Sequence, residues 1–208
     1  MLDNLALGES SVRRGTRNSR LLNISVDNEI TLKVLEENDA EALYRHVDAH
    51  RAYMREWLPW VDSEQSPADT KRFIQLVQQQ YRQHEGLQTG IWYNGEIAGV
   101  IGYHRFDWPN RATSIGYWLS KEFQGHGIMT RSCRALVDYA FGELGLHRVE
   151  IRCAVGNLKS RAIPERLGFR VEGTAREAEW LYDHFVDLIV YAMLDYEWRE
   201  KKKRNELP

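Results

Sequence analysis

The 208-residue sequence contains few cysteines, no long apolar run and almost no net charge. Cys133 and Cys153 each lie in an apolar periodic stretch, which favours buried free thiols. Two thiols are too few for a disulfide framework or a zinc site, and they fit a reducing compartment. The sequence also lacks a run of roughly 20 apolar residues that could span a membrane, and the apolar core of a secretory signal. We therefore expect a cytoplasmic protein without a metal ion or membrane contact.

The net charge of −2 argues against a domain that binds nucleic acid through a basic surface. The charge is unevenly distributed, because residues 1–22 carry +2 and residues 199–208 carry +3, so residues 23–198 carry −7. We expect a flexible basic N-terminal extension over 1–22, one acidic domain over 23–198 and a basic C-terminal tail over 199–208. Only the two basic ends argue for contact with nucleic acid, whereas the acidic domain favours a cationic partner.

Hydrophobic periodicity predicts a single α+β domain with a mixed sheet. Asn94-Gly95 is a strong hairpin signal between two strand-like runs, and a third run follows after a second turn, so three strands should form an antiparallel meander. We expect helices before the meander at 36–50 and 66–84, an aromatic loop at 55–60, meander strands at 88–93, 96–106 and 112–119, a long helix after residue 127, a strand at 147–154, a short helix at 158–167, and strands near 169–178 and 184–195.

The turn Gln124-Gly-His-Gly127 connects the strand that ends at Leu119 to the long helix. Glycines allow close approach of the backbone to a ligand, and the free N–H groups at a helix start favour an anion. The turn therefore suits a main-chain phosphate site, although a tight strand–helix turn without a ligand has the same signature. It is neither the dinucleotide-binding G-x-G-x-x-G nor a P-loop.

Three further motifs accompany this turn in a fixed order: Trp57-Leu-Pro-Trp60, Asn157-x-x-Ser160 and the segment from Arg161 to Phe169. Together they resemble the GNAT N-acetyltransferase superfamily, and in particular its ribosomal-protein N-acetyltransferase (RimJ/RimL-like) branch, over about residues 28–197. One position departs from the wider pattern. Glu122 stands three residues before the first glycine, where the superfamily often has Gln or Arg.

The resemblance implies a mostly antiparallel mixed sheet with helices on both faces. Its two central parallel strands, one ending at Leu119 and one at about 148–154, should splay apart in a V. It also implies acetyl-CoA as cosubstrate and no metal, with pantetheine along the first strand and pyrophosphate on the glycine-rich turn. The residues expected to contact the cofactor are Tyr117, Trp118, Leu119, Gln124, Gly125, His126, Gly127, Ile128, Met129, Asn157 and Ser160.

Asn157 and Ser160 carry two interpretations. The resemblance implies that Asn157 contacts the cofactor and that Ser160 lies near its sulfur, where a hydroxyl could protonate the departing thiolate. An ordinary helix start with Asn as its cap explains the same spacing. The two interpretations are compatible, because capping and ligand binding use the same helix end.

The catalytic base has several candidates. Glu179 matches the position where the ribosomal branch places a catalytic carboxylate, and Glu177 is its rival, since strand alternation puts both on one face. His104 and His184 are second choices, and His126 fits a phosphate neighbour better than a base. A solvated acid at a strand edge is the simpler explanation of Glu179.

The acceptor end of the cleft could be formed by Trp57, Trp60 and Trp108, although core packing explains each of them as well. The predicted reaction is transfer of acetyl from acetyl-CoA to a primary amine by direct attack in a ternary complex, most similar to acetylation of the N-terminal α-amine of a ribosomal or other protein. Alternatives are a small-molecule amine (a polyamine, antibiotic or amino-acid analogue) as acceptor, or a non-catalytic acyl-CoA-binding module. A homodimer is a family-level expectation.

Overall fold

The computed structural model describes residues 22–208. The N-terminal extension predicted over 1–22 lies, except for its last residue, outside the described residues. The helices and strands are β1 (Asn23–Ser25), β2 (Ile30–Val34), α1 (Ala40–Ala49), α2 (Arg51–Arg55), α3 (Pro67–Arg82), β3 (Leu87–Tyr93), β4 (Glu96–Asp107), β5 (Ala112–Leu119), α4 (Ile128–Gly142), β6 (Arg148–Ala154), α5 (Leu158–Arg166), β7 (Arg170–Leu181), β8 (His184–Leu194) and α6 (Asp195–Lys203), with short 3₁₀ turns at Glu37–Asp39, Val61–Ser63 and Lys121–Phe123.

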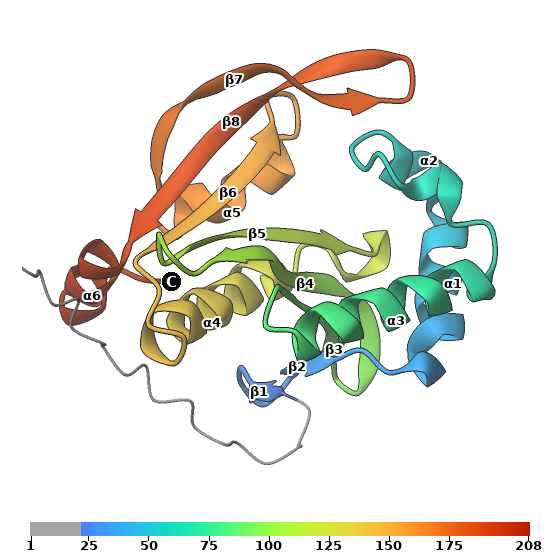
Figure 1. Cartoon of the computed structure of the whole chain (residues 1–208), viewed down its shortest axis with the longest axis horizontal. Coiled ribbons are helices and arrows are strands. Elements are labelled where there is room, and N and C mark those ends of the chain that lie inside the picture. Colours follow the sequence, from blue (N-terminus) through green and yellow to red (C-terminus); the bar gives the residue numbers. More distant parts are fainter. Residues whose placement is uncertain (1–21) are drawn as a thin grey trace, which may run out of the picture.

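Eight strands form one mixed sheet in the order β1-β2-β3-β4-β5-β6-β8-β7. All neighbouring pairs are antiparallel except β5 and β6, which are parallel. The parallel pairing begins at Ala112 with Arg148 and ends at Ile115 with Ile151, although both strands continue. Beyond this point the strands separate, and Figure 1 shows β6, β8 and β7 leaning away from β5. The predicted α+β architecture with a V-shaped splay is confirmed.

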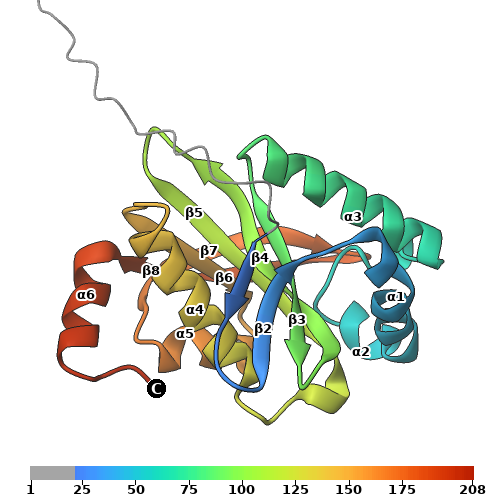
Figure 2. The ribbon, with the colours of Figure 1, turned by 90° about the horizontal axis from the view of Figure 1, so that it is seen from below.

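Helices cover both faces of the sheet. Alternate residues of β4 point to opposite faces, so two neighbouring positions of this strand show which helices pack on each side. Val100 packs with Leu43 of α1 and Ile74 of α3 in one cluster. The next residue, Ile101, belongs to the larger cluster on the other face, which includes Cys133 of α4. Figure 2 shows α3 and α1 grouped on one side and α4 with α5 on the other. The two layers of helix hold the central strands, and with them the splay, in a rigid frame.

The start of α3 follows from its sequence. Pro67 occupies the first turn, where a missing N–H group costs nothing. Asp69 accepts hydrogen bonds from the Ser66 hydroxyl at 2.7 Å and from the Gln65 N–H at 3.1 Å, so the residues before the helix are held in an extended conformation. A short helix, α2, which the sequence did not predict, ends at the first residue of the predicted aromatic segment at 55–60.

The boundary expected between residues 198 and 199 falls inside α6, so the last ten residues do not begin as a separate tail. Trp198 is only 1% exposed and its Nε1 donates a hydrogen bond to Oδ1 of Asp138 on α4 at 2.8 Å. Lys202 lies 2.7 Å from the same carboxylate oxygen. The basic run is therefore partly a helix that docks on α4 through one buried indole.

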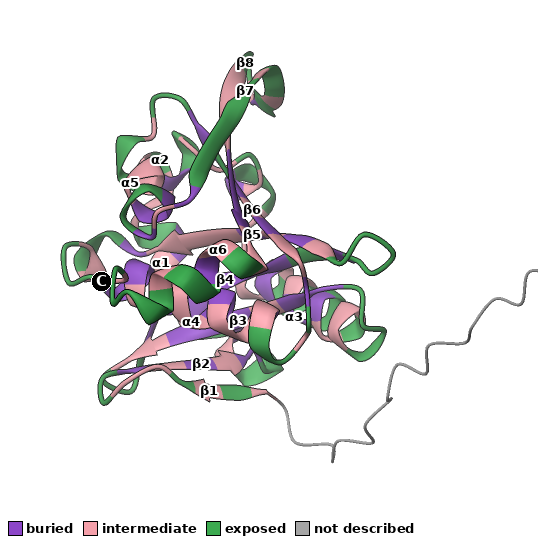
Figure 3. Cartoon of the chain, turned by 90° about the vertical axis from the view of Figure 1, so that its left-hand side faces the viewer, coloured by how far each residue is buried: buried purple, intermediate pink, exposed green. Residues whose placement is uncertain are grey.

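At the edge of the sheet, Figure 3 shows that strand β7 is largely exposed.

We expect Trp198→Ala to destabilise the protein by about 3–5 kcal/mol, because a buried indole is replaced by a cavity. Tyr196→Ala is the matched control on the same helix, since this ring is 50% exposed, and it should cost less than about 1 kcal/mol. Urea unfolding followed by circular dichroism measures both. Equal, small losses for the two variants would show that α6 does not contribute to the stability of the core.

Candidate active site

Two cavities meet where β5 and β6 separate. The first, here called the loop cavity, has a volume of about 800 Å³ and lies beside the turn at Gln124–Gly127. The second, the tryptophan cavity, has a volume of about 590 Å³ and is lined by Trp57, Trp60 and Trp118. The residues that line both are Trp57, Leu58, Tyr117, Trp118, Asn157 and Ser160. These shared residues form the junction, where groups held in the two cavities can react.

The glycine-rich turn has the geometry of an anion site. Gly125 and Gly127 adopt positive φ angles of 86° and 69°, which favour glycine. Gly127 is the N-cap of α4, and no side chain caps this helix start. The first N–H groups of a helix have no partner within it, and the helix dipole adds partial positive charge. The start of α4 thus offers main-chain donors at the wall of the loop cavity.

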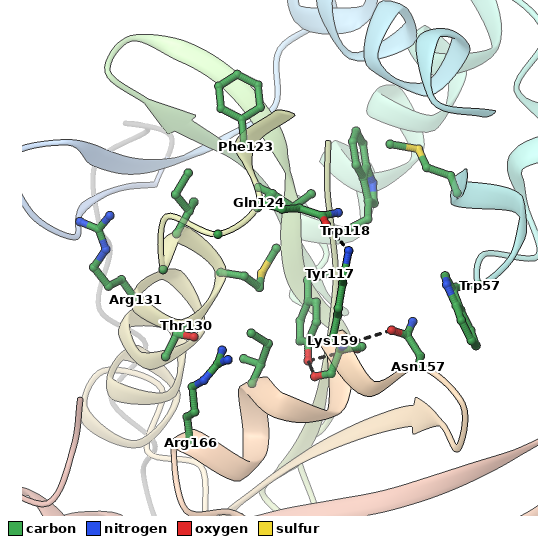
Figure 4. A pocket seen from close by; sticks show the side chains of 18 of the residues that line it. Trp57, Tyr117, Trp118, Phe123, Gln124, Thr130, Arg131, Asn157, Lys159 and Arg166 are labelled. Atoms are coloured by element: carbon green, nitrogen blue, oxygen red, sulfur yellow. Dashed lines mark hydrogen bonds between the residues drawn. The ribbon is translucent and has the colours of Figure 1, made fainter. Parts of the chain in front are cut away.

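Three cations that the sequence analysis did not single out also line the loop cavity: Arg131, Lys159 and Arg166 (Figure 4). Arg131 is paired with Asp27 at 2.7 Å and Glu29 at 2.9 Å. Lys159 Nζ donates to Oε1 of Gln124 at 3.1 Å. The position of Lys159 inside the Asn157-x-x-Ser160 motif was the one signal that could have identified it. The loop cavity therefore combines main-chain donors with side-chain positive charge.

Of the eleven residues predicted to contact the cofactor, ten line the loop cavity: Tyr117, Trp118, Leu119, Gln124, Gly125, Gly127, Ile128, Met129, Asn157 and Ser160. His126 is the exception. Its exposed ring lies 6.0 Å from the ring of Tyr93, and Nδ1 lies 3.3 Å from the carbonyl oxygen of Phe123. Its side chain therefore lies outside the cavity wall, while its backbone belongs to the turn.

Glu122, the departure from the superfamily pattern, has a structural role. Its carboxylate contacts Nδ1 of His46 at 3.0 Å and Nε2 of His50 at shorter range, and it accepts a hydrogen bond from the Ser120 hydroxyl at 2.6 Å. Although partial burial opposes ionisation, these hydrogen bonds and the charge of His50 lower the pKa of Glu122 to about 2. Glu122 lines neither cavity. It connects the end of α1 to the segment that precedes the glycine-rich turn.

The junction contains a polar cluster. Asn157 Oδ1 accepts a hydrogen bond from the Ser160 N–H at 3.1 Å, so the predicted cap is present, and Asn157 lines both cavities as well. The Tyr117 hydroxyl donates to the Ser160 carbonyl at 2.9 Å. Ser160 Oγ also donates to the Tyr117 hydroxyl oxygen at 3.4 Å. Ser160 is thus held with its hydroxyl at the point where the cavities meet.

Cys153 lies closer to this cluster than the sequence suggested. Its Sγ is 3.2 Å from Ser160 Oγ, and it lines the tryptophan cavity. Burial raises the pKa of the Cys153 thiol, and burial raises the pKa of the Tyr117 hydroxyl far more. Both groups are therefore protonated near neutral pH. A protonated thiol is a poor nucleophile, so the geometry does not favour a covalent intermediate on Cys153.

Glu179 lines the tryptophan cavity and is partly buried. Among residues 22–208, no group forms a hydrogen bond or ion pair with its carboxylate, and burial raises its pKa. A carboxylate without a partner and with a raised pKa, beside a reaction cavity, has the properties of a general base.

The expectation that Glu177 shares a face with Glu179 is wrong. The β7–β8 register shifts between Ala175 and Glu179, and Glu177 adopts a φ angle of 48° within this irregularity. A bulge interrupts strand alternation. The Glu177 N–H donates to Asp187 Oδ1 at 2.8 Å, and its exposed side chain lines neither cavity.

The two second-choice histidines differ in position. His104 lines the tryptophan cavity, with Nδ1 3.1 Å from Ser114 Oγ, and its ring lies over Gly116, where a Cβ would come within 2.3 Å of Nε2. Although His104 is exposed, desolvation by the surrounding protein lowers its pKa. It is therefore neutral near pH 7. His184 is exposed, pairs with Asp183 at 2.7 Å and lines neither cavity.

The three tryptophans expected at the acceptor end of the cleft do not lie together. Trp57 and Trp60 line the tryptophan cavity as expected, but Trp108 does not. Trp108 lies in the β4–β5 turn, at the end of β5 opposite to the splay, where Nε1 donates to the His84 carbonyl at 2.8 Å and the ring lies 4.9 Å from Phe106. Its expected place at the acceptor end is wrong, because the turn points away from the junction.

No group of His, Cys, Asp and Glu within residues 22–208 has the geometry of a metal site. Within the same residues, no helix has the length and apolar content that crossing a membrane requires.

Comparison with known proteins agrees with these features. The family model described as "Acetyltransferase (GNAT) domain" matches residues 29–170. A putative ribosomal N-acetyltransferase of Bacillus subtilis is 42% identical over 85% of this chain and 97% of its own length. The structure of RimL, the ribosomal L7/L12 α-N-protein acetyltransferase, in complex with coenzyme A is 29% identical, with a TM-score of 0.81 over 83% of this chain and 98% of the other. The microcin C7 self-immunity acetyltransferase MccE, solved with acetyl-CoA and AMP, is 32% identical, with a TM-score of 0.78 over 81% of this chain and 94% of the other.

We expect Gly127→Ala to weaken binding of coenzyme A by roughly 5- to 30-fold, because a left-handed alanine costs about 1–2 kcal/mol and the helix start relaxes away from its anion-binding geometry. No steric clash contributes, since the nearest atom to a Cβ at this position is 3.9 Å away. Gly142→Ala, at the other end of α4, is the control because a Cβ there meets nothing and φ is not positive. Isothermal titration calorimetry measures both. An unchanged affinity of Gly127→Ala for coenzyme A would contradict a main-chain anion site at the start of α4.

Proposed function

Because the chain belongs to the GNAT acetyltransferase domain family, we propose that it transfers acetyl from acetyl-CoA to the N-terminal α-amine of a protein. The chain is an N-acetyltransferase of this family, and the protein acceptor is what we propose. The observation that supports the proposal most is the meeting of two cavities at the splay. One cavity contains Glu179, whose carboxylate has no partner among the described residues, and the other contains the open start of α4.

The loop cavity suits the acetyl donor. Where β5 and β6 part, the edge of β5 from Gly116 to Leu119 has no strand partner on the β6 side, so an extended amide chain such as pantetheine could pair with it. The start of α4 would hold the pyrophosphate, and Lys159 and Arg166 add charge for further phosphate oxygens. These residues would place the thioester at the junction beside Ser160.

The tryptophan cavity suits the amine. An α-ammonium group must lose a proton before it attacks, and Glu179 can accept that proton directly or through water. The C–N bond then forms as the C–S bond breaks, and the Ser160 hydroxyl can donate a hydrogen bond or a proton to the departing thiolate. Holding both reactants in adjoining cavities supplies much of the acceleration without an enzyme nucleophile. Direct attack in a ternary complex needs no reaction at Cys153.

A small-molecule amine is the second candidate acceptor. It is favoured by the likeness to MccE, which was solved with acetyl-CoA and the small nucleotide AMP. The tryptophan cavity, with the indoles of Trp57 and Trp60 in its wall, could hold a flat or aliphatic small molecule as well as a peptide.

Three further expectations accompany the main proposal. A ribosomal-protein acceptor would place the enzyme in the cytoplasm, which the two free cysteines also favour. A homodimer and a contact of the basic ends with nucleic acid stay predictions. For the C-terminal end, such contact would involve the exposed lysines of α6 rather than a separate tail.

An acceptor panel tests the proposed function. We expect release of free coenzyme A thiol with peptides that begin with Ser or Ala, and none with the same peptides blocked at the N-terminus. Spermidine, an aminoglycoside and amino-acid amides form the small-molecule arm. Turnover of small amines without any peptide turnover would contradict the protein-acceptor proposal. Binding of acetyl-CoA without turnover anywhere would favour a non-catalytic module.

We expect Glu179→Gln to lower kcat/KM by about 100- to 1,000-fold, in the range of lost general-base catalysis. The base acts when ionised, so wild-type activity should fall as pH drops through the pKa of Glu179, which burial raises above its ordinary value of 4.5. The variant should lose this acidic limb of the pH profile. Glu177→Gln is the matched control and should leave the profile unchanged, because its side chain lies outside both cavities.

Two outcomes would contradict this mechanism. An acidic limb that persists in Glu179→Gln would assign the base to another group. An acetylated Cys153 that is trapped and transfers its acetyl group to the acceptor would replace direct attack by a covalent route.

A further inference from the structure

The tryptophan cavity contains a second partly buried carboxylate, Glu64, which the proposed chemistry does not use. Glu64 follows the 3₁₀ turn Val61–Ser63 and precedes α3. It lines the tryptophan cavity but not the loop cavity, so it lies away from the junction where the amine and the thioester meet. Glu64 would therefore contact a part of the acceptor other than the nitrogen that attacks the thioester.

The protein holds Glu64 firmly. Arg51 donates to the carbonyl oxygen of Val61 at 2.7 Å and to that of Glu64 at 2.6 Å, which fixes the backbone of this segment. The hydroxyl of Thr70, only 4% exposed, donates to Glu64 Oε2 at 2.7 Å and so orients the carboxylate. The side chain is therefore arranged before any ligand arrives, which lowers the entropy cost of binding.

Glu64 is nevertheless left without a cationic partner. Within residues 22–208, no Lys, Arg or His nitrogen lies within 4.0 Å of its carboxylate, since the Arg51 guanidinium donates to two backbone oxygens and pairs with Asp48 at 3.4 Å. Burial raises the pKa of Glu64 and the charge of Asp69 adds to this effect, whereas the Thr70 hydrogen bond and the more distant charges of Arg72 and Arg51 act in the opposite direction without cancelling it. A partly desolvated carboxylate is stabilised when a ligand brings a positive charge to it.

The dimensions of the cavity indicate how far this charge lies from the reacting amine. The lining runs from Gln88 on β3 to Cys153 on β6, which are three strand positions apart in the sheet. At about 4.8 Å per strand, this distance is at least roughly 14 Å, because Cys153 lies beyond Ile151, where β6 has already parted from β5. An extended peptide advances about 3.4 Å per residue, so about four residues span it. Glu64 stands beside Thr70 of α3, the helix that packs on β3, and hence towards the end far from Cys153.

The side chains that line the tryptophan cavity between its Gln88 and Cys153 ends favour a long cationic side chain. Trp57, Trp60 and Phe73 line the cavity and offer apolar faces to the methylene groups of Lys or Arg. The cation in the lining, Arg152, is already paired with Glu150 at 3.0 Å. The charge of −7 on residues 23–198 adds a general attraction for such a ligand.

We propose that Glu64 is a specificity-determining residue that binds a Lys or Arg side chain within the first four residues of the acceptor polypeptide. The proposal rests on the proposed protein acceptor and names its class more closely: an N-terminus with a basic residue near the reacting α-amine. Glu64 acts on binding of the acceptor and takes no part in proton transfer.

Steady-state kinetics with matched peptides tests this inference. Peptides that begin with Ser carry either Lys or the uncharged norleucine at position 2, 3 or 4, with the rest of the sequence constant. In the wild type, we expect the best Lys peptide to have a KM about 10-fold below that of its norleucine partner, the effect of roughly 1.4 kcal/mol. In Glu64→Gln this preference should fall below about twofold, through a higher KM of the Lys peptide.

Two further variants isolate the charge. Glu64→Asp keeps the carboxylate and should retain part of the preference for Lys. Glu56→Gln removes an exposed carboxylate in the same segment between α2 and α3, outside both cavities. This variant should retain the full preference for Lys. Matching melting temperatures confirm that the variants fold.

The outcomes separate this inference from the proposed function. The inference is overturned if the wild type shows no preference at any position, or if Glu64→Gln lowers kcat equally on both members of a peptide pair. If no peptide is acetylated, the protein acceptor itself fails. Spermidine is then the probe of the Glu64 site, and a KM unaffected by Glu64→Gln overturns the site as well.

Discussion

The end of the parallel β5–β6 pairing at Ile115 and Ile151 is the constraint on which the site depends. Each strand keeps its antiparallel partner on the other side, β4 for β5 and β8 for β6, so both continue as ordered strands after they part. The backbone edge of β5 is thereby exposed inside the protein rather than at its margin. A strand edge without a partner presents unpaired N–H and C=O groups, which can pair with a strand of another chain. Here it forms a wall between two cavities.

The same separation determines which side chains can meet. Tyr117 from β5, Cys153 from β6 and Ser160 from α5 form one hydrogen-bonded cluster because the gap admits side chains from three elements. The glycine-rich turn follows the free end of β5 directly, so the start of α4 opens on the same space. Binding of an anionic donor by an acidic domain needs no excess of positive charge, because the main chain supplies the donors and a few cations assist.

Much of the fold could be predicted because its signals are local. Asn94-Gly95 and the alternating runs around it determined the meander, and Pro67 with Asp69 indicated the start of α3. The motif residues of the junction could also be identified, since Asn157 and Ser160 are both a cap pair and cavity lining. The prediction for Glu177 failed because a bulge in β7 breaks alternation, and no residue in the sequence marks that bulge. Trp108 was misplaced because its expected role rested on residue type alone, whereas its position in the turn before β5 puts it at the end of that strand opposite to the splay.

The sequence by itself determined most of the elements, the sheet's antiparallel meander, the glycine-rich start of α4 and the family resemblance, because each depends on spacing along the chain. Only the tertiary structure decided where the strands part, which of two nearby glutamates enters the cavity, and that Trp198 docks part of the basic C-terminal end on α4. It also decided that Glu64 is partly buried and forms no ion pair within residues 22–208, since its surroundings come from α2, α3 and the sheet. Contacts between residues distant in the chain, rather than local preference, set these features.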